Sequence, residues 1–429
     1  MHLLDVLEVR SSPAAAVMLA LTRRCPLSCR HCSTESLMSS EQHDAQIFEN
    51  FVAGFTPENR PEYVLMSGGE VLLRPRLVQR IAERCREVGT RTHILSGMFF
   101  ARTERIPDRI KSAIDAVDHF SASLDAFHEE EVERAAVLRV LRQLLDEGKD
   151  VSLQVVGLDE EDPYLAEATE DIRTTLGDRA PVWVSLVQAG GRAREWLADE
   201  LVRRGVRLPV DRSAKTGSEK TRSTTARPQA AVDPHRLLPS PCSLASWPLV
   251  SFDGTVVACC NQDVVDGLGG RLPAHLRLGH ASSDSWEELR RRHLDRHLLR
   301  GLRAFGPQYL ADQAGSDCAE GYCGTCFKLS DDPATAASVR AMMQRPSGVL
   351  MADQIQRMVG EAGPAGFARR YGTRRYGHLL LLGHPDSEAL QAEYRAAAGT
   401  GSGKADGAGS DGRAGGTGHS TGEVLECAG

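Results

Sequence analysis

The sequence predicts an α/β fold of parallel strands followed by a smaller cysteine-rich unit, and three observations lead to this expectation. Between residues 15 and 200, short apolar runs alternate with amphipathic stretches of helical length. Glycine and polar residues follow several of these runs. Beyond residue 240, two apolar runs flank an Asp-Gly pair beside further cysteines. Strands that alternate with helices of this length are parallel and joined by right-handed crossovers.

The individual elements are predicted from hydrophobic periodicity. Six segments are short, apolar and bounded by polar residues or glycine, and we expect them to be strands: Val17–Leu21, Tyr63–Met66, Arg91–Leu95, His119–Ser123, Val151–Val156 and Val182–Val187. Five segments between them carry apolar residues at helical spacing: Glu41–Phe55, Pro75–Val88, Ile106–Val117, Glu130–Glu147 and Tyr164–Leu176. Residues that follow parallel strands lie at one edge of the sheet, where parallel barrels build active sites.

Changes in composition divide the chain into five predicted segments. They are a core (1–205), a linker (206–240), a cysteine-rich domain (241–335), a helical extension (336–395) and a tail (396–429). The linker is predicted from Lys215–Arg227, which is rich in Ser, Thr and charge. Thr335–Gly360 has a helical pattern, whereas the Gly-rich tail has almost no large apolar side chains and is expected to be disordered.

The composition excludes some classes of partner. Among 429 residues, 51 Lys and Arg and 58 Asp and Glu give a net charge of −7, and acidic residues surround the basic clusters. We therefore expect no nucleic-acid partner. No apolar run reaches the roughly 18 residues of a membrane helix, so no membrane span is expected. Eleven cysteines, mostly clustered, indicate metal ligation in a reducing cytoplasm rather than disulfides.

Three cysteines lie within eight residues directly after the first predicted strand. Cys25, Cys29 and Cys32 can bring three thiolates to one point from a single loop. A closed structural metal site normally takes four protein ligands, whereas a site that does chemistry leaves one position open. The alternative is half of a zinc knuckle, with His31 or a remote cysteine as the fourth ligand.

Two further segments place polar groups at strand ends. Tyr63–Met66 runs into Ser67-Gly68-Gly69-Glu70, where the glycines permit close approach of the backbone to a ligand and Glu70 adds an acceptor. Ser123 and Asp125 lie at the end of a later strand and suit the hydroxyls of a ribose.

In combination, these motifs resemble the radical S-adenosylmethionine (radical SAM) superfamily. The resemblance implies a partial (β/α)6 barrel over residues 1–205, in which Cys25, Cys29 and Cys32 hold the catalytic 4Fe–4S cluster that cleaves SAM. It also implies that SAM is bound by His31, Ser67, Gly68, Gly69, Glu70, Ser123 and Asp125. Glu70 would accept from the SAM ammonium, and His31 stands where the family usually has a large aromatic residue near the adenine.

The second cysteine region begins with a predicted β-hairpin. Leu249–Val257 holds two apolar runs around an Asp-Gly turn, with Cys242 ahead of it and Cys259 at its exit. Such a hairpin can meet a later C-x2-C pair and close a four-thiolate site. The spacing resembles the SPASM or twitch auxiliary-cluster domain of radical SAM enzymes.

The number of cysteines favours one auxiliary cluster, because two such clusters normally use seven cysteines in this family. The predicted ligands of one auxiliary 4Fe–4S cluster are Cys242, Cys259, Cys323 and Cys326. Cys318 could replace one of them or bind a second, incomplete cluster. A structural zinc site is the alternative for this region.

The resemblance implies hydrogen abstraction by a 5'-deoxyadenosyl radical, and an auxiliary cluster favours net two-electron oxidation. The preferred substrate is a ribosomal peptide or another natural-product precursor that is crosslinked, epimerised or dehydrogenated. Expected partners are a reductant such as flavodoxin or ferredoxin and, for a peptide substrate, a separate recognition protein or direct docking. The alternatives are a dehydrogenase of aminocyclitols or sugar alcohols and a non-enzymatic iron-sulfur carrier or zinc-binding scaffold.

Overall fold

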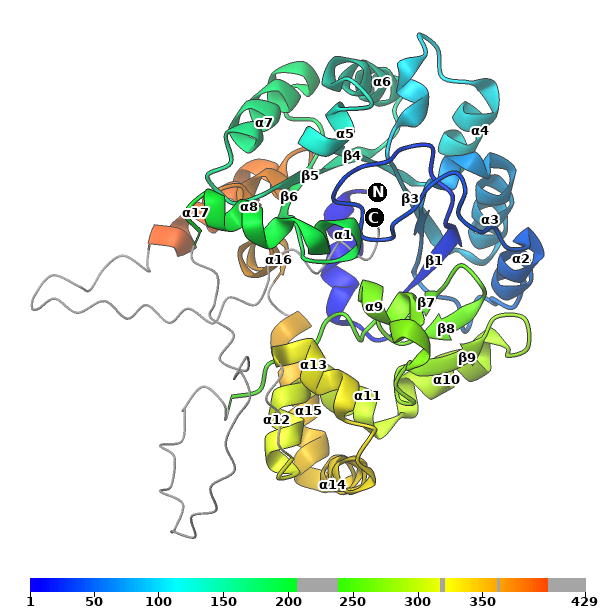
Figure 1. The fold of residues 1–429 in the computed structure, drawn as a ribbon, viewed down its shortest axis with the longest axis vertical. Helices are drawn as coiled ribbons and strands as arrows, with labels where there is room; N and C mark the ends of the chain where they lie inside the picture. The colour runs from blue at the N-terminus through cyan, green and yellow to red at the C-terminus, as the bar shows by residue number, and fades with distance from the viewer. Residues whose placement is uncertain (207–237, 317–320, 361–362, 400–429) are drawn as a thin grey trace, which may run out of the picture.

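One nine-stranded sheet organises the protein in the computed structural model, which describes residues 1–206, 238–316, 321–360 and 363–399 (Figure 1). Its strands are β1 (Ala16–Thr22), β2 (Tyr63–Gly68), β3 (Arg91–Ser96), β4 (His119–Asp125), β5 (Val151–Gly157), β6 (Val182–Leu186), β7 (Leu249–Val250), β8 (Thr255–Val257) and β9 (Arg277–His280). Most of the predicted linker and all of the tail beyond Gly399 lie outside the described residues, as does Cys318.

The helices that cover the sheet are α1 (Leu3–Glu8), α2 (Ala45–Ala53), α3 (Pro75–Val88), α4 (Asp108–Ala116), α5 (Ala126–Glu129), α6 (Arg134–Asp146), α7 (Pro163–Leu176) and α8 (Leu197–Arg203). The later helices are α9 (Gln262–Val265), α10 (Trp286–Asp295), α11 (His297–Phe305), α12 (Pro307–Gln313), α13 (Gly321–Lys328), α14 (Pro333–Gln344), α15 (Pro346–Gly360), α16 (Gly363–Tyr371) and α17 (Ser387–Gly399).

Strands β1 to β6 are parallel and lie side by side in chain order. They form an arc with α2, α3, α4, α6 and α7 on its outer side (Figure 1). This arrangement confirms the predicted α/β fold with a partial (β/α)6 barrel. All seven residues of β1 are buried, as expected for a parallel strand covered on both faces.

The sequence-based boundaries of the six barrel strands agree with the structure to within two residues. The helical prediction for residues 335–360 is wrong in one respect, because α14 and α15 are separate helices. Arg345 adopts an extended conformation with φ −73° and ψ 140° between them. The following Pro346 disfavours the helical conformation of Arg345, and this ends α14.

The predicted hairpin is present, and it extends the barrel sheet. Strand β7 pairs in parallel with β1, through Met18 with Leu249 and Leu19 with Val250. Strand β8 follows in antiparallel fashion, and β9, which the sequence did not reveal, completes the sheet. The barrel and the hairpin of the cysteine-rich region therefore share one hydrogen-bonded sheet.

The C-terminal extension returns to the other end of the sheet. Helix α16 and the 3-10 helix η7 (Gly377–Leu381) pack with α1 beneath β6, around a separate apolar core. Trp183 of β6 is 1% exposed in this core, and its ring centroid lies 6.2 Å from that of Phe367. Trp183 and Phe367, which are 184 positions apart in the chain, thus meet at the last barrel strand.

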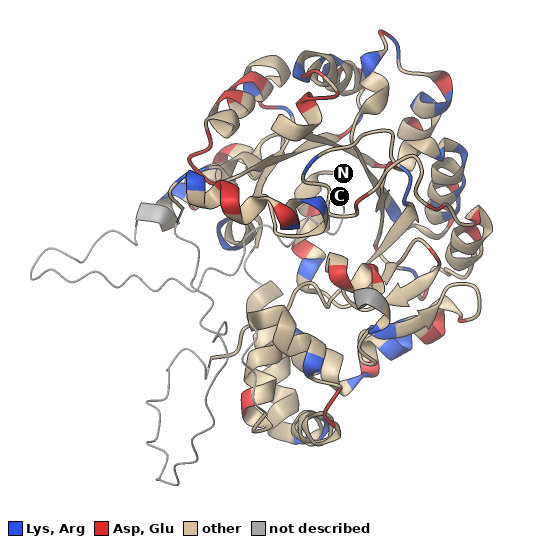
Figure 2. Cartoon of the chain, in the orientation of Figure 1, with Lys and Arg blue, Asp and Glu red and all other residues tan. Residues whose placement is uncertain are grey.

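Charged residues of both signs are interspersed over the outer helices, while the strands are mostly uncharged (Figure 2). Within the described residues, none of the helices has the length and apolarity that crossing a membrane requires.

Replacement of Trp183 tests the docking of the C-terminal extension. We expect Trp183→Ala to lower the free energy of unfolding by about 3 to 5 kcal/mol, because a large buried ring leaves a cavity. Trp183→Phe should cost much less, because it keeps an aromatic ring and removes an indole N–H that has no partner among the described residues. Urea denaturation followed by circular dichroism measures both, and equal losses would contradict this packing account.

Candidate functional site

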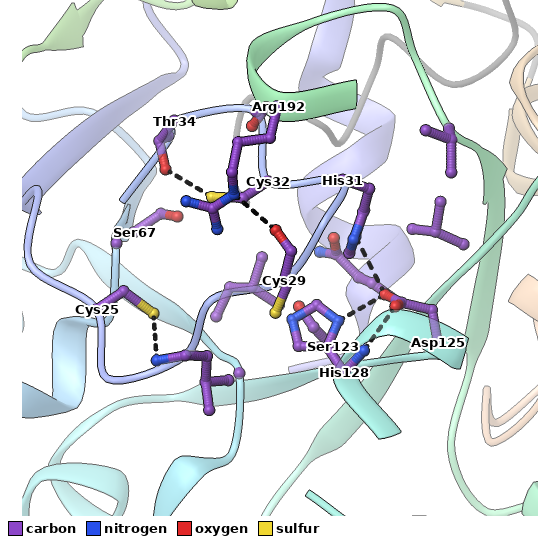
Figure 3. A pocket seen from close by; sticks show the side chains of 18 of the residues that line it. Cys25, Cys29, His31, Cys32, Thr34, Ser67, Ser123, Asp125, His128 and Arg192 are labelled. Atoms are coloured by element: carbon purple, nitrogen blue, oxygen red, sulfur yellow. Dashed lines mark hydrogen bonds and ion pairs between the residues drawn. The ribbon is translucent and has the colours of Figure 1, made fainter. Parts of the chain in front are cut away.

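A cavity opens at the carboxyl edge of the barrel strands, and most of the predicted site residues line it. Its wall includes the three cysteines of the loop after β1, the turn after β2, and residues at the ends of β4, β5 and β6 (Figure 3). The predicted residues that line it are Cys25, Cys29, His31, Cys32, Ser67, Gly68, Gly69, Ser123 and Asp125. Glu70 is not among the lining residues.

The glycine turn after β2 holds the start of the cysteine loop. The Gly69 amide donates to the Thr22 carbonyl at 2.7 Å, and the Glu70 amide donates to the Arg24 carbonyl at 2.9 Å. A methyl group on Gly69 would lie 2.4 Å from the Arg24 carbonyl oxygen, and Gly68 has φ +137°. The glycines are therefore required by contact between two backbone segments, in addition to the predicted approach of a ligand.

A second clamp holds the loop from the β6 side. The guanidinium of Arg192 donates from Nε to the Cys29 carbonyl at 2.8 Å and from Nη1 to the Ser36 carbonyl at 3.1 Å. The amide of Arg192 donates to the Cys32 carbonyl at 3.1 Å. Gly191 permits this approach, because a methyl group there would lie 2.3 Å from the Cys32 carbonyl oxygen.

Glu70 supports the wall of the cavity. Its carboxylate is fully buried and accepts from the Leu72 amide at 2.9 Å, the Gly97 amide at 2.9 Å and the Ser96 hydroxyl at 3.0 Å. Burial raises the pKa of Glu70 to about 7, although these hydrogen bonds act to lower it. Its predicted contact with the SAM ammonium stays a prediction.

Asp125 forms the centre of a buried polar cluster at the end of β4. One carboxylate oxygen accepts from the amides of Phe127 and His128 at 2.9 and 3.0 Å, at the start of α5. The other lies 2.6 Å from His128 Nδ1 and 3.3 Å from His31 Nε2. These four partners already occupy both oxygens, and the predicted ribose contact of Asp125 stays a prediction. Ser123, also assigned to the ribose, lines the cavity nearby.

The charge state of this cluster follows from its burial and its partners. Burial alone would raise the pKa of Asp125, but the charges of His128 and His31 hold it well below its usual range. Burial opposes protonation of His128, yet Asp125 raises the pKa of His128 well above its usual value. His31, Asp125 and His128 have the proximity of a metal site. However, a protonated His128 is not a metal ligand, and the internal ion pair accounts for the arrangement.

His128 is a site residue that sequence reasoning missed. It follows Asp125 by three residues, which at the start of a helix brings the two side chains together. His31 lies parallel to Phe127, with ring centroids 4.7 Å apart, so one of its faces is already covered.

Polar atoms without partners face the cavity from β5 and the cysteine loop. Gln154 is 7% exposed, and its Nε2 has no partner among the described residues; the same holds for Nδ1 of His31. Ser185 and Gln188 line the same wall, together with the apolar side chains of Val156 and Val187. Buried polar atoms of this kind are normally hydrogen-bonded, so a bound ligand is the partner that they lack.

The three cysteines of the first loop fit a metal cluster. Cys25, Cys29 and Cys32 are free thiols that share the cavity. Burial, and to a lesser extent the charges of Glu70, Cys32 and Cys29, raise the pKa of the Cys25 thiol to about 12. Several thiolates so close together need a cation to offset their charge, and three ligands leave an iron open to another molecule.

The second cysteine group, which consists of Cys242, Cys259, Cys323 and Cys326, also converges. Cys242 precedes β7, Cys259 follows β8, and the other two lie one turn apart on α13. Burial, and then the negative charges of Cys242, Cys259 and Cys323, raise the pKa of the Cys326 thiol well above its usual value. The donor set suits either a 4Fe–4S cluster or zinc. Cys318, the remaining candidate, lies outside the described residues.

Comparison with known proteins gives one family match and several similar solved structures. Residues 19–172 match the model of the Radical SAM superfamily. Similar solved structures include Streptococcus suis SuiB bound to S-adenosylmethionine, at 15% identity over 76% of each chain with a TM-score of 0.45. Another is anSMEcpe with bound AdoMet and the Cp18Cys peptide, at 12% identity over 79% of this chain and 99% of that chain, with a TM-score of 0.41. A third is BtrN with AdoMet and 2-DOIA, at 12% identity over 67% of this chain and 87% of that chain, with a TM-score of 0.35. No curated protein matches the chain.

Substitution of Gly69 tests the turn that holds the cysteine loop. Gly69→Ala should loosen residues 23–35, because the methyl group cannot fit against the Arg24 carbonyl. Hydrogen exchange of the loop amides should then become at least several-fold faster. Gly190→Ala is the matched control, since it lines the same cavity but its methyl group would meet nothing within 4 Å. Similar exchange in both variants would contradict this assignment.

The raised pKa of Glu70 predicts how the stability of the metal-free protein depends on pH. Between about pH 4.5 and about pH 7, the folded state holds a proton on Glu70 that the unfolded state has released. The free energy of unfolding should therefore fall as pH rises through this window, by about 3 kcal/mol from this group. Denaturation at several pH values measures the slope. Glu70→Gln should flatten it, and an unchanged slope would contradict the prediction.

Proposed function

We propose that this chain, which carries a radical SAM domain over residues 19–172, is an enzyme that cleaves SAM reductively and oxidises a peptide or another natural-product precursor. The observation that carries the proposal is the cavity at the carboxyl edge of the barrel. There, three cysteine thiols share one enclosure with the Gly68-Gly69 turn, His31 and the unpartnered amide of Gln154.

The proposed cluster ligands are Cys25, Cys29 and Cys32. A 4Fe–4S cluster bound there supplies the electron that cleaves SAM to methionine and a 5'-deoxyadenosyl radical, which abstracts hydrogen from the substrate. The protein's own contribution is to hold these parts in place. Arg192 and the Gly68-Gly69 turn fix the backbone of the loop at both ends of the cavity.

The remaining residues that line the cavity bind SAM or the substrate and enclose the reaction. The buried Nδ1 of His31 and the Gln154 amide are available to SAM or substrate, and Ser123 and Ser185 add hydroxyls. Leu95, Val156 and Val187 give the cavity apolar walls, which exclude water from a reactive intermediate.

The second cysteine group supports net oxidation as the outcome. A substrate that has lost a hydrogen atom must lose one more electron to form a ketone, an imine or a new bond. We propose that Cys242, Cys259, Cys323 and Cys326 hold one auxiliary 4Fe–4S cluster that accepts this electron or binds the substrate. The grouping of these cysteines beside the barrel sheet, with Cys259 buried and the other three half-buried, supports this role.

The alternative within the same chemistry is dehydrogenation of an aminocyclitol or sugar alcohol. The amides of Gln154 and Gln188 and the hydroxyl of Ser185 suit the hydroxyl groups of such a substrate as well as a peptide backbone. Incubation with candidate substrates and mass spectrometry of the products separates the two: a loss of two hydrogens from a cyclitol, but from no peptide, favours the alternative.

SAM cleavage by the reconstituted protein is the direct test. Under anaerobic conditions with dithionite, the protein should form 5'-deoxyadenosine. Changing Cys25, Cys29 and Cys32 together to Ala should abolish this product, because the open iron position disappears. The triple variant should still retain about four irons on the second cysteine group.

Cys85→Ala serves as the control, because this thiol is buried on α3 away from both groups. It should leave product and iron content unchanged. Product above background from the triple variant would overturn the assignment of the loop. An iron-loaded protein that never cleaves SAM would instead favour an electron carrier, and zinc on the second group would favour a structural site there.

A further inference from the structure

Arg10 is a fully buried arginine that the proposed chemistry has not used. It lies in the 3-10 helix η1 (Val9–Ser11), ahead of the first barrel strand, and is 1% exposed. Its Nη2 donates to the Cys260 sulfur at 3.1 Å, but its Nε and Nη1 have no hydrogen-bond partner among the described residues. Within the described residues, no carboxylate is among the charges that act on the pKa of Arg10.

The position of Arg10 is fixed by the segment that follows Cys242. Its guanidinium carbon lies 4.3 Å from the centroid of the Trp247 ring, and Trp247 is itself 1% exposed. The Trp247 indole donates to the Val9 carbonyl at 3.1 Å, and the Ala14 amide donates to the Ser246 carbonyl at 2.8 Å. The side chain is therefore held against Trp247 and Cys260, and Cys260 directly follows Cys259 of the second cysteine group.

A buried cation is costly unless its donors find acceptors or its charge is compensated, so the surroundings of Arg10 must supply one or the other. Burial lowers the pKa of Arg10 to about 10, and the charges of Cys259 and Cys242 act in the opposite direction. Arg10 therefore stays protonated at neutral pH. Two of the four thiolates of the second group are thus near enough to act on it electrostatically.

Arg303 shows what a buried arginine looks like when its hydrogen bonds are made within the protein. It is 4% exposed, and it donates to the carbonyls of Ala245, His293 and Leu294. Arg10 has no such set of carbonyls, and its contacts are with sulfur and an aromatic ring. Burial lowers the pKa of Arg303 and the charge of Cys242 also acts to raise it, but the hydrogen bonds of Arg303 are made to carbonyls. What sets Arg10 apart is that its Nε and Nη1 are left without a partner among the described residues, and these donors are free for an anionic site.

We propose that Arg10 is the counter-cation of the second cysteine group, so that its charge and its two unpartnered nitrogens, Nε and Nη1, stabilise the four-thiolate metal site and favour its reduced form. This inference rests on the proposed auxiliary cluster. Arg10 acts here as a positioning and charge-compensating residue. A metal site with four thiolates is anionic, and adding an electron increases its negative charge, which a nearby fixed cation favours.

The test uses the full chain with Cys25, Cys29 and Cys32 changed to Ala, so that only the second group binds metal. Arg10→Met and Arg10→Lys are compared in this background, with Arg139→Met on the far α6 helix as a control for loss of one positive charge. Iron and zinc contents are measured first. The midpoint potential then follows from a dithionite titration with redox mediators, monitored by electron paramagnetic resonance.

We expect Arg10→Met to decrease the equilibrium constant for reduction at least tenfold, which is about 59 mV for a one-electron couple. The midpoint potential of Arg10→Lys should lie closer to that of the parent protein, and the potential of Arg139→Met should equal that of the parent. An unchanged potential in an iron-loaded Arg10→Met protein would overturn the inference. If Arg10→Met loses its iron but Arg10→Lys retains it, the result supports the role of the positive charge. Equal loss of iron from both variants would show that Arg10 acts through packing and would overturn the inference.

The outcome of the metal analysis separates this inference from the auxiliary-cluster proposal. If the second group of the parent holds zinc, the proposed iron-sulfur cluster is wrong, but the counter-cation is still tested. Zinc release to a chelator should then be at least several-fold faster from Arg10→Met than from Arg10→Lys. Equal release rates would overturn the role of Arg10.

Discussion

The candidate site depends on contact between the backbone of the glycine turn after β2 and the first residues of the cysteine loop. Two amide-to-carbonyl hydrogen bonds, from Gly69 to Thr22 and from Glu70 to Arg24, join them at a separation that admits no side chain on Gly69. Arg192 makes the corresponding contact from the other side. A loop without helix or strand is thereby held in position for its thiols to share one cavity, as precise chemistry at a site requires.

The buried carboxylates serve this arrangement in different ways. Glu70 accepts from the amides of Leu72 and Gly97, and burial favours its neutral form more strongly than these hydrogen bonds and the charge of His128 oppose it. Asp125 has two histidines beside it and is held in the charged form. Two buried carboxylates thus have opposite protonation preferences within one site, because their partners differ.

The barrel and the cysteine loop could be predicted from local patterns in the sequence. Hydrophobic periodicity indicates the strands and helices, which pair in chain order, and the spacing of the cysteines indicates the loop. Contacts between distant segments were not accessible from spacing. The sequence around Arg10 does not indicate that this residue packs against Trp247. Likewise, no sequence pattern predicts β9 or the docking of α16 beneath β6. Glu70 shows a related limit: its motif was recognisable, but only the fold reveals which donors occupy its carboxylate.

The pairing of β7 with β1 has a consequence for how the two cysteine groups are spaced. Neighbouring strands lie roughly 4.8 Å apart, and β1 leads into the first group while the β7–β8 hairpin carries Cys259 of the second. The span between the two centres is therefore fixed by a ladder of backbone hydrogen bonds. It does not depend on the length of chain between Val206 and Leu238, so homologues can gain or lose residues there without altering the path along which an electron would travel.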